Sequence, residues 1–376
     1  MTPLRSPIDV LLPLLADAPD LSVLQDESSW NRIKQQSPGY GVAPLVAYVA
    51  RPHISRAERV WCDRVLVESW TRYERMLTQL EFLLSILAAD GVPVIALKGP
   101  LLSPRYYNPP FLRKPSADLD LAVVENDLER ACRVLIGVGY IPEMSIESAK
   151  AQAHHLEFSH PSRPHVELHF RLSHRALGIP VNEFFERAVP CRLPSGREAL
   201  VLAPADQILH LVLHLAQSRF GTLFHLYEIR RVCRAEPPAV LAEAVQRAVD
   251  HHYCGVLRMM DIAFRLRWNE PFLPPGIQVP KTWLDWRLTP KLYRTFERYS
   301  TPGRGQSVAT RVWGRWLDFQ LTDSPAEAVR KAAFFVNTAR FYIGDRQAWG
   351  TPRHIHFTAG SPAPAKIRDD SSPPAR

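Results

Sequence analysis

The sequence predicts an α+β protein in which a small mixed β-sheet is flanked by N-terminal and C-terminal helical regions. Residues 1–90 and the residues after about 182 repeat apolar side chains at steps of three and four, whereas residues 91–178 alternate short apolar runs with turns. Strands and helices grouped in separate blocks are typical of this class. We therefore predict a helical region at 1–90, a mixed core at 91–178, a helical region at 179–348 and a disordered tail at 349–376.

The bulk composition fits a soluble globular protein with a substantial core. The chain has 376 residues, of which 46% are hydrophobic and 22% charged. Its 46 basic and 38 acidic residues give a formal net charge of +8, which suits a polyanionic ligand such as a nucleotide. Nothing else in the sequence supports nucleic acid as a partner, because the Arg residues are scattered and no basic run or aromatic-basic motif occurs.

The cysteines and the hydropathy pattern favour a reducing, cytoplasmic location without a membrane anchor. The five cysteines are odd in number, lie far apart and have no metal-ligand spacing, so we expect reduced thiols. No apolar run approaches the roughly 20 residues that span a bilayer. Asp9, Asp17 and Asp20 interrupt the Leu-rich N-terminus, and no small-residue cleavage site follows, which argues against a signal peptide.

A long helix is predicted at the end of the N-terminal region. Residues 56–89 contain no Pro or Gly, and leucines recur there at three- and four-residue steps. These leucines are Leu77, Leu80, Leu83, Leu84 and Leu87. Asp90-Gly91 supplies a stop signal, so we expect the helix to end before it.

Short apolar runs bounded by turn residues predict four strands in the mixed core. The strands are expected at 94–97, 117–124, 155–159 and 165–170. A helix should follow the second strand, because Asn126 and Glu129 form a plausible capping box and apolar residues then fall on one face. Gly137 and Gly139 end that helix.

Helical patterns return in the C-terminal region. Pro204 suits a first helical position, and apolar residues follow it at steps of three and four up to Leu215. A second helical stretch, 238–267, is interrupted near His251-His252. A third, 325–342, opens with Ser324 as its expected N-cap.

The second strand carries the first candidate site residues, Asp118 and Asp120. Side chains alternate along a strand, so the two acids share one face while Leu119 and Leu121 point into the core. Two like charges about 7 Å apart at Cα repel each other, and a divalent cation would turn this repulsion into coordination. Mg²⁺ prefers such carboxylates together with phosphate oxygens. An Asp-x-Asp motif alone also fits an ordinary solvated strand face.

Three further features favour a phosphate and metal site over a solvated face. Lys98-Gly99 ends the preceding strand, where Gly lets a phosphate approach the backbone and Pro100 can open a helix. Pro104 follows closely enough to make that helix short or kinked. Glu167 supplies a third carboxylate on a later strand, and Arg113 lies in the loop before the Asp strand, where its fork could reach phosphate oxygens.

These motifs together resemble a known family. In chain order they are Leu97-Lys98-Gly99, Tyr107, Arg113, Ser116, Asp118-Leu119-Asp120-Leu121, Gly137-x-Gly139-Tyr140 and Glu167-Leu168-His169. The set resembles the uncharacterised bacterial nucleotidyltransferase family of the DNA polymerase β-like nucleotidyltransferase superfamily. The resemblance covers about residues 80–235, including Asp206 to His214. It departs at Glu228, where the family more often has Asp, and at Ala117, which offsets Ser116 by one residue.

The resemblance implies a nucleotidyltransferase that moves an NMP from an NTP to an acceptor by two-metal-ion catalysis. Its catalytic and metal-binding residues would be Asp118, Asp120 and Glu167, holding two Mg²⁺ ions. Its nucleotide-binding residues would be Lys98, Gly99, Arg113, Ser116 and His169. Glu167 would be either a metal ligand or the base toward the acceptor. His169 could orient Glu167 or contact phosphate, or simply pack.

Several alternatives remain open from the sequence. The acceptor could be a small molecule, a peptide or a saccharide. An RNA-modifying transferase is weakly allowed by the charge, and a catalytically inactive binding or antitoxin-type module is the alternative outside enzymes. His210 and His214 stand at i and i+4 like two zinc ligands, but Leu211 follows where the zinc-protease motif has Glu. We therefore interpret them as core or cleft histidines.

Overall fold

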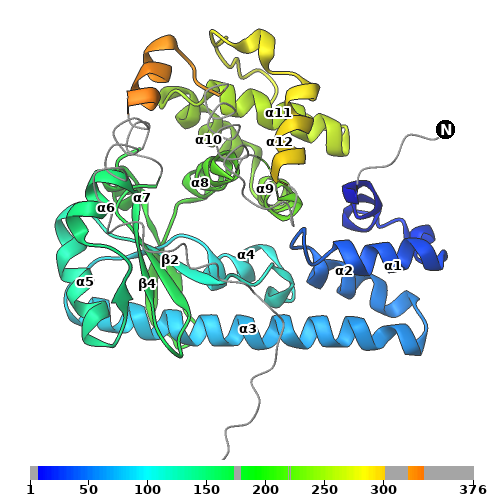
Figure 1. Cartoon of the computed structure of the whole chain (residues 1–376), viewed down its shortest axis with the longest axis horizontal. Helices are drawn as coiled ribbons and strands as arrows, with labels where there is room; N and C mark the ends of the chain where they lie inside the picture. The colour runs from blue at the N-terminus through cyan, green and yellow to red at the C-terminus, as the bar shows by residue number, and fades with distance from the viewer. Residues whose placement is uncertain (1–6, 173–178, 219, 221, 301–320, 334–376) are drawn as a thin grey trace, which may run out of the picture. The chain divides into compact units, whose positions relative to one another are not determined.

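The structure is a computed structural model, and its described residues all lie in one compact unit, Met1–Phe334. The described residues are 7–172, 179–218, 220, 222–300 and 321–333. The predicted α+β class is confirmed, since one mixed sheet is flanked by helices from both ends of this unit (Figure 1). The predicted tail at 349–376 lies outside the described residues, as does the end of the helix predicted at 325–342.

The sheet has seven strands in the order β3-β4-β5-β2-β1-β7-β6. The strands are β1 (Ile95–Ala96), β2 (Asp118–Ala122), β3 (Ile141–Pro142), β4 (His155–Ser159), β5 (His165–His169), β6 (Val189–Arg192) and β7 (Glu198–Val201). The pairs β2–β5 and β1–β7 are parallel, and the other four pairs are antiparallel. All four strands predicted from the sequence are therefore present, at nearly the predicted positions.

The helices form two groups around this sheet. They are α1 (Glu27–Gln36), α2 (Ala43–Ala50), α3 (Arg56–Ala89), α4 (Ser103–Tyr106), α5 (Leu128–Gly137), α6 (Ile146–Gln152), α7 (Val181–Arg187), α8 (Pro204–Gln217), α9 (Leu223–Ala235), α10 (Pro238–Asp250), α11 (Cys254–Trp268) and α12 (Pro290–Ser300). In Figure 1, α3 runs below the sheet and α8 and α9 lie above it. None of the described helices has both the length and the hydropathy that crossing a membrane requires.

The helix α3 has the predicted bounds because both of its ends carry local signals. The Ser55 hydroxyl accepts a hydrogen bond from the backbone N–H of Glu58, which satisfies one free amide of the first turn. Asp90 ends the helix, and Gly91 follows in the left-handed region with φ of 70°. The predicted Leu77, Leu80, Leu83 and Leu87 are all buried, whereas Leu84 is only partly buried.

One face of the sheet packs against α3 and α5. Leu119 and Leu121 of β2 and Val166 and Leu168 of β5 are buried in one cluster with apolar residues of both helices. These four residues alternate with the acids along their strands. The acids therefore point to the opposite face, which is the face toward α8.

The start of α5 differs from the expected capping box of Asn126 and Glu129. A single 3-10 turn, Glu125–Asp127, leads into the helix, and Asp127 stands at the N-cap position without a side-chain capping bond. The tight turn already directs backbone amides to local carbonyls, as in the bond from Asp127 N–H to the Val124 carbonyl. The apolar face of the helix is as predicted, since Leu128, Ala131, Cys132 and Leu135 are buried.

The hairpin of β6 and β7 was not expected from the sequence. It extends the sheet beyond residue 178, where we predicted helices only. The turn is tight: Leu193 N–H donates to the Arg197 carbonyl over 2.8 Å, and Gly196 has φ of 84°. The strands have only four residues each, and Ala199 is the one residue in them that is fully buried, so the apolar signal is weak. The division of the chain at 178 thus stays a prediction.

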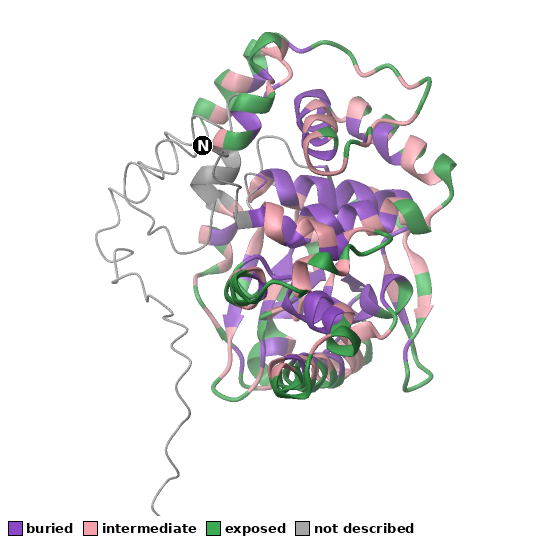
Figure 2. Cartoon of the chain, turned by 90° about the vertical axis from the view of Figure 1, so that its right-hand side faces the viewer, coloured by how far each residue is buried: buried purple, intermediate pink, exposed green. Residues whose placement is uncertain are grey.

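The C-terminal helices enclose the polar face of the sheet. Residues 205–213 of α8 are all buried, so this helix is covered on every side. The interruption that we predicted near His251-His252 in the helical stretch 238–267 is confirmed, because α10 ends at Asp250 and α11 begins at Cys254. Ser324 also caps as predicted, accepting a hydrogen bond from Glu327 N–H. Figure 2 shows buried residues concentrated in the inner helices and the sheet, with exposed residues on the outer turns.

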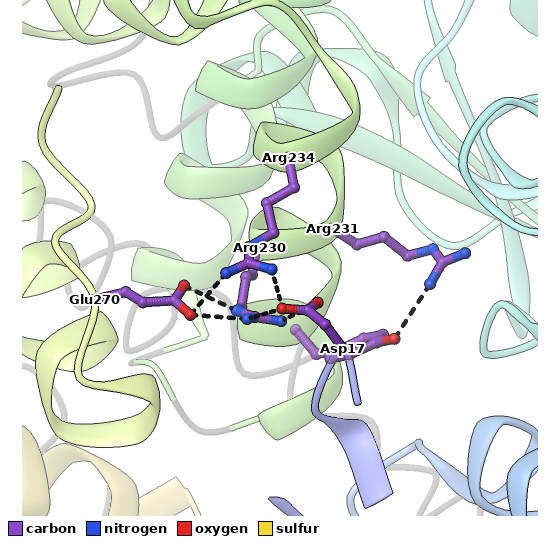
Figure 3. Close-up of polar contacts among 6 residues, drawn as sticks. Asp17, Arg230, Arg231, Arg234 and Glu270 are labelled. Carbon is purple, nitrogen blue, oxygen red and sulfur yellow. Dashed lines mark hydrogen bonds and ion pairs between the residues drawn. The ribbon is translucent and has the colours of Figure 1, made fainter. Parts of the chain in front are cut away.

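A charged network joins the N-terminal segment to α9 (Figure 3). The guanidinium of Arg230 donates to both oxygens of Asp17, at 3.2 and 2.9 Å, and to both oxygens of Glu270, at 3.1 and 2.8 Å. Arg234 contacts the same two acids. Arg231 points away from them in this view. Since Arg230 is 5% exposed, the two carboxylates neutralise a buried cation.

Candidate active site

Two neighbouring parallel strands bring the three predicted acids to one face of the sheet. β2 and β5 pair so that Asp120 lies directly opposite Glu167, and Asp118 lies opposite His165. Asp120 is 4% exposed, whereas Asp118 and Glu167 are partly exposed. Because side chains alternate along each strand, His169 also lies on this face.

The closest group in this site is Asp120, Glu167 and His169. One side-chain ligand atom from each lies within 4.8 Å of the others. His169 Nε2 is 3.3 Å from Asp120 Oδ1 and 3.2 Å from Glu167 Oε2. The Asp118 carboxylate is not part of this group, although it shares the face. The imidazole of His169 thus bridges the two opposing acids.

Lys98 brings the main positive charge to the acids. Its ammonium donates to Asp120 Oδ1 over 2.7 Å and lies 3.5 Å from His214 Nδ1. Burial alone would lower the pKa of Lys98, but the charge of Asp120 and the hydrogen bond to it outweigh this effect and raise the pKa. Burial alone would raise the pKa of Asp120, but Lys98 and His169 hold it well below its usual value. This pair is therefore ionised at neutral pH.

The charges of the site fit a divalent cation. Three carboxylates face one ammonium and one imidazole, so negative charge is in excess. Burial and the charges of Asp120 and Glu167 raise the pKa of Asp118 to about 6. A bound cation would relieve this repulsion. Carboxylate oxygens are the hard ligands that Mg²⁺ prefers, so the donor set of Asp118, Asp120 and Glu167 fits this ion.

The turn after β1 has a glycine in a backbone conformation that favours glycine, and a short helix follows it, as the sequence predicts. Gly99 has φ of 75°, which a side chain at this position would strain. A 3-10 turn, Gly99–Leu101, and the one-turn α4 follow, so the helix at this position is short, as Pro104 predicts. Ser116 lies across the turn, with its hydroxyl 4.0 Å from the point where a Cβ on Gly99 would be. Such short elements offer backbone amides but little helix dipole.

Arg113 pairs with a buried glutamate, whereas we expected its guanidinium to reach phosphate oxygens. Its Nε and Nη2 donate to the two oxygens of Glu228 over 2.6 and 3.1 Å, and Nη1 donates to Ser116 Oγ over 3.4 Å. The side chains of Arg113 and Glu228 are 5% and 1% exposed. All three nitrogens of this guanidinium are thus engaged within the protein. A direct contact with phosphate would require a buried ion pair to open.

Three histidines of α8 and α9 lie close to Lys98: His210 is buried, and His214 and His225 are partly buried. The rings of His214 and His225 are 4.8 Å apart between centroids, and those of His210 and His214 are 6.4 Å apart. Burial, and then nearby lysine charges, lower the pKa of each well below 6.5, so the rings are neutral. Among the described residues, neither ring nitrogen of His210 has a hydrogen-bond partner. The ring of His210 thus offers two nitrogens without a protein partner in the described part of the chain.

Sequence reasoning missed the roles of Glu228 and of the neighbouring histidines. Glu228 attracted notice only as a departure from the family pattern, and nothing local links it to Arg113. His210 and His214 were interpreted as core or cleft residues, which fits their burial, but their closeness to Lys98 was not foreseen. His210 and Glu228 could both have been recognised as polar residues at helical positions that are otherwise apolar. Buried polar residues of this kind usually have a hydrogen-bonding role.

Comparison with known protein families supports the resemblance seen in the motifs. A model described as "Uncharacterised nucleotidyltransferase" matches residues 26–266, which include every site residue named above. No curated protein matches the sequence. Since the match covers more than half of the 376 residues, the chain belongs to the uncharacterised nucleotidyltransferase family.

Proposed function

We propose that this protein transfers an NMP from an NTP to an acceptor. The observation that carries the proposal is the pairing of Asp120 with Glu167 on neighbouring strands, beside the Lys98 ammonium and the Gly99 turn. Clustered carboxylates next to a lysine and a glycine turn suit a polyphosphate held through a divalent cation. Family membership supports the same reaction class.

In the proposed reaction an acceptor oxygen attacks the α-phosphorus of the NTP. The new bond joins that oxygen to phosphorus, the bond from phosphorus to the bridging oxygen breaks, and pyrophosphate leaves. The acceptor proton must go to a base. Glu167 is the candidate, because it is partly exposed and lies opposite Asp120.

Asp118, Asp120 and Glu167 would together hold two Mg²⁺ ions. When bound, these ions would supply charge stabilisation to the transferring phosphoryl group. Asp120 is the most buried of the three acids and would be a ligand of this pair. Glu167 could then act as ligand or base, the two roles that its partial exposure allows.

Lys98, the Gly99 backbone and Ser116 would bind the phosphates. Lys98 is already in the site, and its ammonium is a compact charge on a flexible stem that can move from a carboxylate to a phosphate. The positive φ of Gly99 turns the backbone without a Cβ in the way. The Ser116 hydroxyl lies 4.0 Å from the point where a Cβ on Gly99 would be.

Arg113 and His169 would act mainly by positioning other groups. The Glu228 pair fixes the Arg113 guanidinium, which in turn donates to Ser116. His169 bridges Asp120 and Glu167, and these two acids outweigh the effect of burial and raise its pKa. An Nε2–H on His169 would hold both carboxylates in place before the nucleotide binds.

The decisive experiment follows the nucleotide label. The protein is incubated with each α-labelled NTP, Mg²⁺ and fractions of a cell lysate, and labelled products are separated by size and by RNase or protease sensitivity. Transfer by wild type and its loss in Asp120→Asn would support the proposal. Asp250→Asn, an exposed acid of α10, is the matched control.

Binding measurements separate the enzyme from a binding module. We expect Mg²⁺ to strengthen NTP binding in calorimetry, and Asp120→Asn to abolish the Mg²⁺-dependent part, because carboxylates repel a triphosphate without a cation. Equal affinity with and without Mg²⁺ would contradict the site described here. Normal Mg²⁺-dependent binding without transfer to any fraction would favour the module, and label in RNA would favour an RNA-modifying transferase.

A further inference from the structure

We propose that His154, His155 and His169 form a second cation site, selective for Zn²⁺ and related transition-metal ions. We call these three residues the histidine site. His155 lies on β4, directly after His154, and His169 lies on β5 with Glu167, so His169 belongs to both groups. The inference depends only on the coordination chemistry of this chain, so it stands apart from the proposed transfer reaction.

The backbone brings the three rings together. β4 and β5 pair so that His155 lies directly opposite His169. The carbonyl of His154 accepts hydrogen bonds from Phe170 N–H and Arg171 N–H, both over 3.1 Å, which fixes this residue beside the end of β5. One ring nitrogen from each histidine lies within 4.8 Å of the others.

The distances suit a tetrahedral ion. His155 Nδ1 and His154 Nε2 are 3.1 Å apart. Two nitrogens that each bind Zn²⁺ at about 2.0–2.1 Å in a tetrahedron are separated by roughly 3.4 Å. The two nitrogens, which lie at hydrogen-bond distance from each other, are therefore spaced nearly as two ligands of one ion would be, and a nitrogen of the third ring lies within 4.8 Å. A fourth position would stay open to water.

Carboxylates hold the outer nitrogens of two of these rings. His155 Nε2 is 3.1 Å from Glu157 Oε1, while its Nδ1 faces His154. His169 Nε2 contacts Asp120 and Glu167, and its buried Nδ1 has no hydrogen-bond partner among the described residues. Metal-binding histidines usually contact a carboxylate through the nitrogen that does not bind the metal. This arrangement explains why a nitrogen of His169 is left buried and unused.

The donor atoms distinguish the histidine site from the carboxylate site. Imidazole nitrogens favour Zn²⁺, Co²⁺, Ni²⁺ and Cu²⁺, whereas carboxylate oxygens favour Mg²⁺. His154 and His155 are partly exposed, so an ion can reach them. Because His169 contacts Asp120 and Glu167, an ion at the histidine site would fix the orientation of the ring that bridges both acids.

Co²⁺ and Zn²⁺ binding to the full chain tests the proposal. After chelator treatment, the protein is titrated with Co²⁺ in excess Mg²⁺, and visible absorption reports the coordination geometry. Zn²⁺ affinity is measured by competition with a chromophoric chelator. We expect one ion per chain with tetrahedral Co²⁺ bands. His154→Asn and His155→Asn should each weaken binding more than about 100-fold, because losing a ligand costs more than the 10–100-fold typical of an outer carboxylate.

Further variants make each outcome decisive. Glu157→Gln and Asp120→Asn should weaken Zn²⁺ binding about 10–100-fold. His165→Asn, an exposed histidine on the same strand as His169, should bind as wild type. The proposal is overturned if the His154 and His155 variants bind normally, or if Mg²⁺ displaces Co²⁺ at comparable concentration. Circular dichroism identifies any variant that fails to fold, and the remaining histidine variant with Glu157→Gln then decides the question.

Discussion

The ammonium of Lys98 lies 2.7 Å from Asp120 Oδ1, in contact with the most buried acid of the proposed cation site. Both groups are nearly buried, with side chains 11% and 2% exposed. An ammonium and a divalent cation cannot both take the strongest position on one carboxylate oxygen without repelling each other. Lys98 would therefore have to shift if a cation bound there, and the phosphates of the nucleotide would receive it.

Replacing Lys98 should change the affinities for Mg²⁺ and for NTP in opposite directions. In Lys98→Met, Mg²⁺ alone should bind about 3–10-fold more tightly, because the competing ammonium is gone. NTP with Mg²⁺ should bind about 10–100-fold more weakly, since a charge-assisted contact of about 1.5–3 kcal/mol is lost. Calorimetry measures both. Lys291→Met, at an exposed lysine, is the control, and a parallel loss of both affinities would show that Lys98 does not compete with the cation.

The Arg113–Glu228 pair should contribute strongly to stability. Glu228→Gln leaves a buried guanidinium without its counter-charge, so we expect a loss of about 3–5 kcal/mol in the free energy of unfolding. Asp63→Asn breaks the exposed Arg51–Asp63 pair and should cost less than about 1 kcal/mol. Urea denaturation of both variants provides the comparison. Similar small losses would mean that Arg113 is free to serve the nucleotide directly.

Local signals account for the parts of the fold that the sequence predicted well. The helix α3 ends where a capping serine and an Asp-Gly pair stand, and β4 and β5 alternate apolar and polar residues between clear turns. The short β6–β7 hairpin has neither feature, because its side chains are mostly only partly buried and its pairing depends on the neighbouring β1. Its place in the sheet is therefore a tertiary effect that no local pattern reveals.

The site shows the same division between local and long-range information. Asp118 and Asp120 could be placed on one face from their spacing alone, and the family pattern added Glu167. The partner of Arg113 lies 115 residues further along the chain, so no spacing rule could find it. The roles of the site residues themselves stay predictions, which the experiments described here address.

The network of Asp17, Arg230 and Glu270 should make part of the stability depend on pH. Hydrogen bonds from Arg230 lower the pKa of both carboxyls below their ordinary values of 3.8 and 4.5. A lowered pKa means that the stabilisation is complete above the ordinary value and is lost as pH falls through the folded value. The double variant Asp17→Asn, Glu270→Gln should thus be less stable than wild type at pH 7.

We expect the free energy of unfolding of the double variant at pH 7 to be about 1–2 kcal/mol below that of wild type. The value is modest because Asp17 is 60% exposed and solvent screens its charge. The difference should stay constant from pH 7 to about pH 5 and shrink as both acids of the wild type become protonated. Chemical denaturation at several pH values measures it. A difference that grows toward low pH would contradict the assigned direction of both pKa shifts.

Substituting Glu167 is the most direct way to distinguish an enzyme from a binding module. A group that acts only as the reaction proceeds lowers turnover far more than nucleotide binding. Asp118 and Asp120 can anchor a cation without it, so Glu167→Gln should keep Mg²⁺-NTP affinity within a few fold. Nucleotidyl transfer should fall by roughly two to four orders of magnitude, the range typical of a lost acid-base group. Calorimetry and the α-labelled NTP assay measure these two quantities on the same preparation.

Glu129→Gln is the matched control for this experiment, because Glu129 is an exposed acid on α5, which packs on the opposite face of the sheet. It should leave both binding and transfer unchanged. A structural role for Glu167 would instead lower stability and binding together, since Glu167 contacts His169 and loss of that contact would loosen the bridge to Asp120. Transfer by Glu167→Gln at the wild-type rate would show that the acceptor loses its proton to another group. His210, whose ring nitrogens have no hydrogen-bond partner among the residues that the structure describes, would then be the next candidate.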